Sequence, residues 1–219
     1  MIKAMLALLM LALLMLALSA GCTRTQADMI EDLLSDSTVQ VELGTAFITT
    51  GLKTGKPIVV TNWHVCARPG DRIIIHRPGQ SDVAIRAELT SAKADLCAGY
   101  VASHMRPLKM AKSLSLNETV YTYGYPAGRL TFSKGVIVGT RSTIMNFGDF
   151  TADCQGPCIR PYLFTSTTLL AAPGSSGSPV VNEQGELVGV VENAQTDVTP
   201  TWSAGIVPFE ALKEFLEAL

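Results

Sequence analysis

The feature that most constrains the fold is a succession of short apolar runs, rich in β-branched residues, with a turn-forming residue between nearly every pair. Short apolar runs punctuated by Gly, Pro, Asn or Asp are typical of strands joined by tight turns. We expect strands at residues 39–49, 57–62, 72–76, 84–89, 95–101, 119–123, 135–140, 162–167, 178–182, 187–192 and 201–207. About eleven strands predict an all-β protein, either a sandwich or a pair of barrels.

Two segments have the apolar period of an α-helix instead. One is the stretch around residues 27–34, and the other is the tail at residues 209–219, directly after Pro208. In the tail, apolar residues recur three and four positions apart, which places them on one face of a helix. They are Leu212, Phe215, Leu216 and Leu219. No GxGxxG or Walker-type loop follows a predicted strand, so the sequence offers no nucleotide site.

The composition excludes several classes of protein. The net charge is −2, and the Lys and Arg residues are scattered, so there is no basic patch of the kind that binds nucleic acid. Gly and Pro are spread among the apolar runs without repeats, which argues against disorder, a coiled coil or a multi-span membrane protein. We therefore expect one domain, or a two-lobed one, that buries a full core.

Residues 1–21 differ from the rest of the chain. Eighteen of the first twenty residues are apolar, Lys3 is the only charge among them, and small residues follow the apolar stretch. A basic start, an apolar stretch and small residues at its end are the parts of a secretory signal peptide. An uncleaved membrane anchor is the alternative, since the stretch is almost long enough to span a bilayer. Both interpretations place the remaining residues outside the cytoplasm.

The end of this segment, LSAGC at residues 18–22, resembles the lipobox of bacterial lipoproteins, in which the Cys after the small residues is lipidated and becomes the first residue. The resemblance implies a lipid on Cys22 and attachment to a bacterial membrane, in the cell envelope or periplasm. An ordinary signal peptide that ends near a Cys is the alternative. Residues 22–37 then form a polar tether, and the domain occupies residues 38–219.

The five cysteines agree with export. If Cys22 carries a lipid, four thiols remain, and four thiols in an oxidising compartment suggest two disulfides. Three pairings are possible. Cys154 and Cys158 lie four residues apart around a Gly-Pro turn, so a local Cys154–Cys158 bond is favoured. Cys66–Cys97 is then the second bond, with two buried free thiols as the alternative. A zinc site lacks the paired CxxC or HxxxH spacing, and we expect neither a metal nor another cofactor.

Three segments carry residues that suit nucleophilic catalysis. They are TNWHVC at residues 61–66, ADLCAGYV at 94–101 and PGSSGSPV at 173–180. A serine hydroxyl is a weak nucleophile at neutral pH, so it needs an imidazole to accept its proton and a carboxylate to hold that imidazole in one tautomer. It also needs backbone N–H groups aimed at the oxyanion, and a glycine two residues before the serine lets the chain curl to supply them.

In this order, the segments resemble those of trypsin-like (chymotrypsin-fold) serine peptidases, particularly the bacterial secreted branch. TNWHVC resembles the family's Thr-Ala-Ala-His segment, ADLCAGYV its Asp-Leu-Ala strand, and GSSGSPVV its Gly-Asp/Asn-Ser-Gly-Gly-Pro motif. The resemblance runs from about residue 40 to the end. It implies two six-stranded antiparallel barrels and a C-terminal α-helix, with the site in the cleft between the barrels. We place the boundary between the two lobes near residues 105–117.

The resemblance also assigns a role to each residue of the three segments. His64 is the general base and then the general acid, and Asp95 orients its ring. Ser176 is the nucleophile, because it lies two residues after the first Gly of the motif and directly before the second. The N–H groups of Gly174 and Ser176 form the oxyanion hole. Ser178 departs from the family pattern, since a second Gly usually stands there.

These residues predict a serine endopeptidase that cleaves a protein or peptide substrate through an acyl-enzyme on Ser176. A catalytically inactive lipoprotein of the same fold, which binds peptides or proteins, is the alternative. A hydrolase of non-peptide acyl groups is less favoured, because its Gly-x-Ser-x-Gly motif normally precedes a helix and no predicted helix follows Ser176. The presence of all three triad residues and both loop glycines favours the peptidase.

Overall fold

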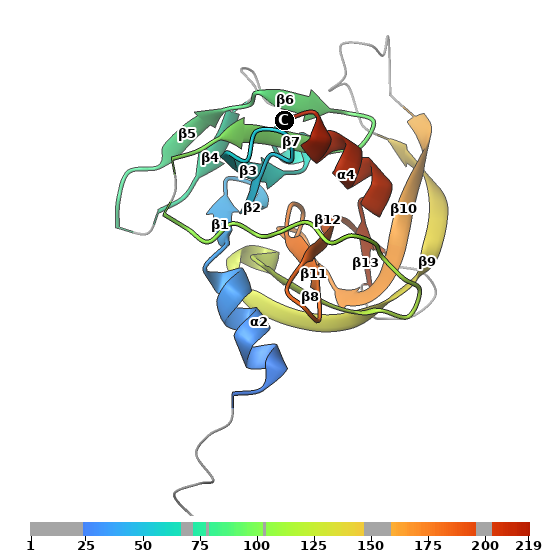
Figure 1. Cartoon of the computed structure of the whole chain (residues 1–219). Helices are drawn as coiled ribbons and strands as arrows, with labels where there is room; N and C mark the ends of the chain where they lie inside the picture. Colours follow the sequence, from blue (N-terminus) through green and yellow to red (C-terminus); the bar gives the residue numbers. More distant parts are fainter. Residues whose placement is uncertain (1–23, 67–71, 78, 103, 147–158, 196–202) are drawn as a thin grey trace, which may run out of the picture.

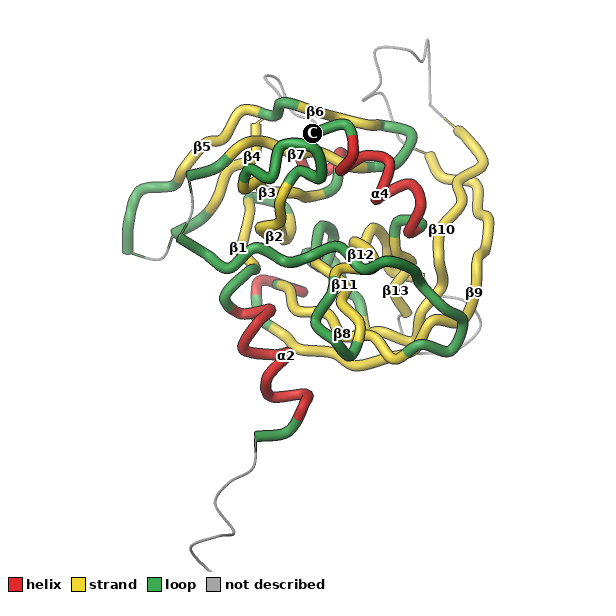
Figure 2. The backbone as a smooth tube through the Cα atoms, in the orientation of Figure 1, coloured by secondary structure: helices red, strands yellow, loops and turns green. Residues whose placement is uncertain are grey.

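The structure is a computed structural model, and it consists of a β-rich body with a helix near each end of the described chain (Figures 1 and 2). It describes residues 24–66, 72–77, 79–102, 104–146, 159–195 and 203–219. Cys22, the signal segment and the Cys154–Cys158 pair lie outside the described residues. None of the helices in the described part of the chain combines the length and the apolar composition that a membrane crossing requires.

The first lobe is an antiparallel sheet of seven strands, in the order β5-β4-β1-β2-β3-β7-β6. These strands are β1 (Thr38–Val41), β2 (Gly44–Thr50), β3 (Pro57–Thr61), β4 (Arg72–Ile75), β5 (Val83–Arg86), β6 (Leu89–Ser91) and β7 (Leu96–Tyr100). One short helical turn, α3 (Trp63–Cys66), follows β3. The β-branched residues of β3, β4 and β5 supply much of the lobe's apolar core.

The two end strands of this sheet, β5 and β6, are consecutive in the chain. Only Ala87 and Glu88 separate them, and the N–H of Glu88 donates to the carbonyl of Ala98 on β7 at 2.8 Å. The stretch from β5 to β6 therefore pairs with β4 through its first half and with β7 through its second half. The resemblance implied six strands in this lobe, and the seventh arises because the bent stretch is divided in two.

The second lobe is a closed antiparallel barrel of six strands, in the order β10-β13-β12-β11-β8-β9. These are β8 (Thr119–Gly124), β9 (Thr131–Asn146), β10 (Ile159–Leu170), β11 (Pro179–Asn182), β12 (Leu187–Gln195) and β13 (Ser203–Ile206), with a 3₁₀ turn, η1 (Pro126–Gly128), after β8. The long pair of β9 and β10 forms one side of the barrel (Figure 1). The all-β, chymotrypsin-like fold class is confirmed.

The tail forms α4 (Phe209–Glu217), as its apolar period predicts. Its buried face joins a core cluster that also takes residues from both lobes, so the lobes share one apolar interior. The members of this cluster include Phe47, Val60 and Leu96 from the first lobe, Tyr121, Val181 and Val190 from the second, and Leu212 and Leu216 from α4. Residues on both sides of the junction between the lobes belong to this common core. The close packing of the core therefore holds residues from the two lobes at fixed relative positions.

The other helix, α2 (Gln26–Ser35), begins at Thr25, whose hydroxyl accepts from the Asp28 N–H in a capping box. Its buried residues Ile30 and Leu34 belong to the core shared by the two lobes, and α2 contacts β8. Most of the segment expected to be a tether is therefore a helix packed on the domain. The reason is its apolar face, which can be buried only against the body of the protein.

Candidate active site

The ends of β3 and β7 place His64 and Asp95 side by side. The two strands are antiparallel neighbours, and Thr61 is directly opposite Cys97 in their register. His64 follows the end of β3 on the single turn α3, and Asp95 lies immediately before β7 begins. Residues that are distant in the sequence are therefore brought to one edge of the first lobe by ordinary strand pairing.

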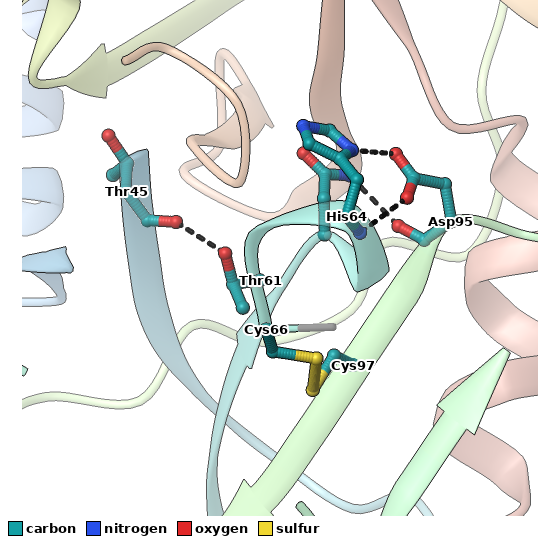
Figure 3. The surroundings of a disulfide bond; sticks show 7 residues. Thr45, Thr61, His64, Cys66, Asp95 and Cys97 are labelled. Carbon is teal, nitrogen blue, oxygen red and sulfur yellow. Dashed lines mark hydrogen bonds and ion pairs between the residues drawn. A yellow bond between two sulfur atoms is a disulfide. The ribbon is translucent and has the colours of Figure 1, made fainter. Parts of the chain in front are cut away.

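The carboxylate of Asp95 accepts two hydrogen bonds from His64 (Figure 3). The His64 backbone N–H donates to Oδ1 at 3.0 Å, and the ring Nδ1 lies 2.7 Å from Oδ2. Because a carboxylate only accepts, Nδ1 carries the hydrogen and Nε2 of a neutral ring is left with its lone pair. The Asp95 side chain is 2% exposed and that of His64 is 40% exposed, so the acid is buried while the imidazole reaches solvent.

The backbone at Asp95 is held in an unusual conformation. Its φ is +50°, in the left-handed region where a residue other than Gly is disfavoured by about 1–2 kcal/mol. The side-chain amide of Asn62 donates to the Asp95 carbonyl at 3.0 Å, which secures this conformation. Strained residues of this kind persist where neighbouring structure fixes them, and they gather at functional sites. Sequence reasoning missed Asn62, although a polar residue directly before His64 at the end of an apolar strand was a usable signal.

The nucleophile loop, residues 173–178, joins β10 to β11 and turns sharply at two glycines. Gly174 has φ +97° and Gly177 has φ +86°, values that only Gly adopts at little cost. Neither glycine has space for a side chain. A Cβ on Gly174 would lie 2.5 Å from the Tyr125 carbonyl oxygen, and one on Gly177 would overlap the backbone carbonyl of Thr45.

Thr45 on β2 ties this loop to the first lobe. Its N–H donates to the Ser176 carbonyl at 2.8 Å, and its hydroxyl donates to the Gly174 carbonyl at 2.9 Å. The same hydroxyl accepts from the Tyr125 N–H at 3.0 Å. One buried threonine therefore connects the nucleophile loop, the end of β8 and the sheet of the first lobe. No local pattern in the sequence predicts this role for Thr45, because its partners Gly174 and Tyr125 are distant along the chain.

Ser176 lies in this loop without a hydrogen bond to His64. Its Oγ donates to the backbone carbonyl of Glu192 on β12 at 3.3 Å, and no hydrogen bond between Ser176 and His64 is present among the described residues. The structure thus brings two of the three predicted triad residues into contact. The third has its hydroxyl directed to a neighbouring strand.

Two backbone N–H groups of the loop have no acceptor within the part of the chain that the structure describes. They belong to Gly174 and Ser176, the two residues predicted to form an oxyanion hole. The intervening and following N–H groups are used: Ser175 donates to Ala172, Gly177 to Val191 at 2.8 Å, and Ser178 back to Ser175. Two unpaired donors that alternate with paired ones are what an anion-binding turn requires.

Tyr125, whose carbonyl contacts Gly174, brings no charge to this region. Burial raises the pKa of its phenol above the ordinary value, and the neighbouring Tyr123 raises it further. The hydroxyl therefore stays neutral at physiological pH.

The predicted disulfide between Cys66 and Cys97 is confirmed (Figure 3). It joins α3 to β7 with a Cα–Cα distance of 6.6 Å across 31 residues of chain, and both cysteines are buried. Closing a loop of this length contributes about 3–4 kcal/mol to stability in the chain-entropy account. The alternative of two free thiols is wrong.

Comparisons with known proteins agree with this geometry. The sequence profile of the family described as trypsin-like peptidase domain matches residues 44–190, which is more than half of the chain. The matched segment contains His64, Asp95 and Ser176.

Solved structures of proteases have the same fold. The active form of the Rv3671c protease from M. tuberculosis is 18% identical, with a TM-score of 0.64 over 85% of this chain and 82% of that one. An inactive form of the same protease is 19% identical, with a TM-score of 0.63 over 86% of this chain and 91% of that one. The HtrA-type protease AlgW, solved with a decapeptide, is 18% identical, with a TM-score of 0.57 over 79% of this chain and 50% of that one.

These structural likenesses establish the fold, and the profile match over most of the domain establishes the family. The chain belongs to the trypsin-like peptidase domain family and is a serine-type peptidase.

Proposed function

We propose that the protein is an endopeptidase that cleaves peptide bonds through an acyl-enzyme on Ser176. The observation that carries this proposal is the double hydrogen bond from His64 to Asp95, which leaves Nε2 of the solvent-reaching ring as a proton acceptor. The unpaired N–H groups of Gly174 and Ser176 support it.

In the proposed mechanism, the Ser176 hydroxyl turns from the Glu192 carbonyl toward His64 when substrate binds. Catalytic hydrogen bonds are often long or absent in free enzymes and form in the substrate complex. His64 Nε2 takes the hydroxyl proton as Oγ attacks the peptide carbonyl, and the N–H groups of Gly174 and Ser176 stabilise the oxyanion. His64 then gives the proton to the leaving amine, and water attacks the acyl-enzyme by the same steps. The Asp95 carboxylate stabilises the imidazolium that forms.

A fluorescent phosphonate probe, followed by peptide mapping, tests this proposal. We expect covalent labelling at Ser176, and loss of labelling in Ser176→Ala together with a fall in kcat of about 10⁵-fold or more. Ser178→Ala is the matched control. Ser178 lies in the same loop, and its buried hydroxyl has no hydrogen-bond partner in the described structure, so labelling should be unchanged. Cleavage of unfolded protein by Ser176→Ala at the parent's rate would refute the proposal.

A peptide-binding protein without activity is the second candidate. One observation favours it, namely that Ser176 Oγ bonds to the Glu192 carbonyl and not to His64. This candidate predicts that the probe leaves the folded parent unlabelled while a peptide still binds. The same labelling experiment therefore distinguishes the two functions.

We also propose that the protein is exported and attached to a bacterial membrane by a lipid on Cys22. The Cys66–Cys97 disulfide supports export, because such bonds persist in oxidising compartments. Metabolic labelling with an alkyne-tagged fatty acid should mark the expressed protein, and Cys22→Ser should abolish both the label and the membrane fraction. A Cys22→Ser variant that remains in the membrane fraction would favour an uncleaved anchor.

A further inference from the structure

The segment that carries His64 is fastened at both of its ends to one residue. At its start, Thr61 is paired with Cys97 in the ladder between β3 and β7. At its end, Cys66 is joined to Cys97 by the disulfide. The stretch 61–66 is therefore a small loop closed on Cys97 by strand pairing on one side and by a covalent bond on the other (Figure 3).

The α3 turn inside this loop has little stability of its own. It has four residues, and its backbone is held by the Val65 and Cys66 N–H groups, which donate to the Asn62 carbonyl at 3.2 and 3.3 Å. A helix as short as this is not stable by itself and depends on its tertiary contacts. The buried side chains of α3 pack into the first-lobe core, but His64 faces solvent. The covalent bond two residues later therefore adds to its two hydrogen bonds with Asp95 in limiting its movement.

Cys97 is also close to the other residues of the site. Cys97 lies two residues after Asp95, the acid that receives both His64 hydrogen bonds. Its ladder partner Thr61 donates through its hydroxyl to the Thr45 carbonyl at 2.7 Å, and Gly177 of the nucleophile loop fits against Thr61 and Thr45 with no room for a Cβ. Cys97 therefore connects His64 and Asp95 with Thr61 and Thr45, the residues that pack against the nucleophile loop.

We propose that the Cys66–Cys97 disulfide positions the general base, so that efficient acylation requires the oxidised protein. This inference rests on the proposed function, since it assigns a role within the same triad. The cysteines are positioning residues, because they act through His64 and Asp95.

Loss of the disulfide is a two-electron reduction. A dithiol reductant breaks the S–S bond, delivers two electrons and two protons to give thiols at Cys66 and Cys97, and becomes a disulfide itself. Because Cys66 and Cys97 are 1% and 0% exposed, a thiolate reaches them slowly in the folded protein. The oxidation state is therefore established during folding, and chains that fold without the bond have the same fold but a poorly placed base.

The test compares a disulfide-free protein with one that is destabilised elsewhere. Cys66→Ala/Cys97→Ala removes the bond, and Cys66→Ala/Cys97→Val restores part of the lost volume. Ile85→Ala is the matched control, because Ile85 belongs to the same first-lobe cluster but lies on β5, where its side chain is next to Gly99 of β7 and forms no part of the disulfide. All variants are assayed at a temperature where circular dichroism shows them fully folded.

The disulfide-free variants should show a phosphonate labelling rate and a kcat about 10–100-fold below the parent, as expected for a misplaced catalytic group, with KM changed by less than about threefold. Ile85→Ala should keep the parent's rate. In NMR spectra, the low-field signal of the His64 Nδ1 hydrogen should be present in the oxidised parent and in Ile85→Ala, and absent without the disulfide. Folded disulfide-free variants that label as fast as Ile85→Ala would overturn the inference.

A measurement on the unmodified oxidised protein decides the question if no disulfide-free variant folds. The measurement is the rate of hydrogen exchange at the His64 backbone N–H, which donates to Asp95. If the loop is held closed on Cys97, this N–H should exchange with solvent as slowly as the N–H groups of the β3–β7 ladder. Exchange about 100-fold faster than the ladder would overturn the inference. If the oxidised parent itself is not labelled at Ser176, the proposed function fails, and that result is separate from either outcome here.

Discussion

The two lobes hold their parts of the site in different ways. The first lobe fixes His64 and Asp95 through two hydrogen bonds to a buried carboxylate and a disulfide that closes the intervening loop. The second lobe presents Ser176 on a turn that has two glycines at positive φ and is held by hydrogen bonds from Thr45. The base and acid are thus assembled in advance, whereas the serine hydroxyl still has to turn from Glu192.

The two lobes should therefore respond differently to substitution. A base–acid pair must keep one tautomer and one orientation, so rigid attachment serves it. A nucleophile loop must form a tight curve around an oxyanion, so its backbone conformation matters more than covalent restraint. Substitutions in the first lobe should therefore affect the chemical step, and substitutions in the loop should affect both stability and catalysis.

Among the substitutions that compare the two lobes, Asp95→Asn should have the largest effect. An amide N–H next to the imidazole forces the hydrogen onto Nε2, which removes the proton acceptor, and in serine peptidases this lowers kcat by about 10⁴-fold. Asp82→Asn is a matched control, because Asp82 also lies beside a histidine, with 3.0 Å between Oδ2 and His76 Nδ1, but on the surface. Steady-state peptide hydrolysis should show the loss only for Asp95→Asn. Equal losses in the two variants would mean that His64 has no special role.

Gly177→Ala should have the next largest effect. A methyl group at φ +86° both strains the backbone and overlaps the Thr45 carbonyl, which should cost about 2–5 kcal/mol of unfolding free energy. Urea unfolding measures this loss. Gly55→Ala is the control, since Gly55 has φ +63° but no atom within 4 Å of the added methyl group. The excess loss at Gly177 gives the energy of the contact between the lobes, and no excess would show that the loop is loosely held.

Thr45→Val should have the smallest effect of the three. It removes a hydroxyl that donates to the Gly174 carbonyl and leaves the Tyr125 N–H without its acceptor, a loss of about 1–3 kcal/mol. The labelling rate at Ser176 should fall by about tenfold as the oxyanion loop loosens. Thr49→Val, on the same strand, also removes a buried hydroxyl bonded to a carbonyl, that of Leu108. It should lose stability but retain the labelling rate, and the same rate for both variants would separate Thr45 from catalysis.

Most of the helices and strands could be predicted from local sequence patterns. The apolar period of the tail predicted α4, and the helical stretch around residues 27–34 is the helix α2. The first-lobe strands lie close to their expected positions because β-branched runs and turn residues are local signals. β9 and β10 are longer than expected, since the apolar pattern fades along their ends while pairing between the two strands continues.

The way in which these helices and strands pack together was harder to predict from the sequence. Nothing local indicated that the segment at residues 26–35 would be fixed to the second lobe, because its partners are contributed by distant strands. The division of one stretch into β5 and β6 has the same kind of cause, because the chain pairs with β4 before residues 87–88 and with β7 after them. Asn62 and Thr45 entered the site through contacts 33 and 129 residues away along the chain, which no local pattern encodes.

The amino-acid sequence was sufficient to predict the fold class, the family, the Cys66–Cys97 pairing among its favoured options and the three segments that supply the candidate triad. These follow from residue types and short spacings, which express local conformational preference and chemical capability. Three features came from the folded structure alone: Asp95 receives two hydrogen bonds from His64, Cys97 holds both ends of the loop around the base, and Ser176 is bonded to Glu192. Distances and orientations between remote residues depend on how strands pair and lobes pack, and this is a property of the whole chain.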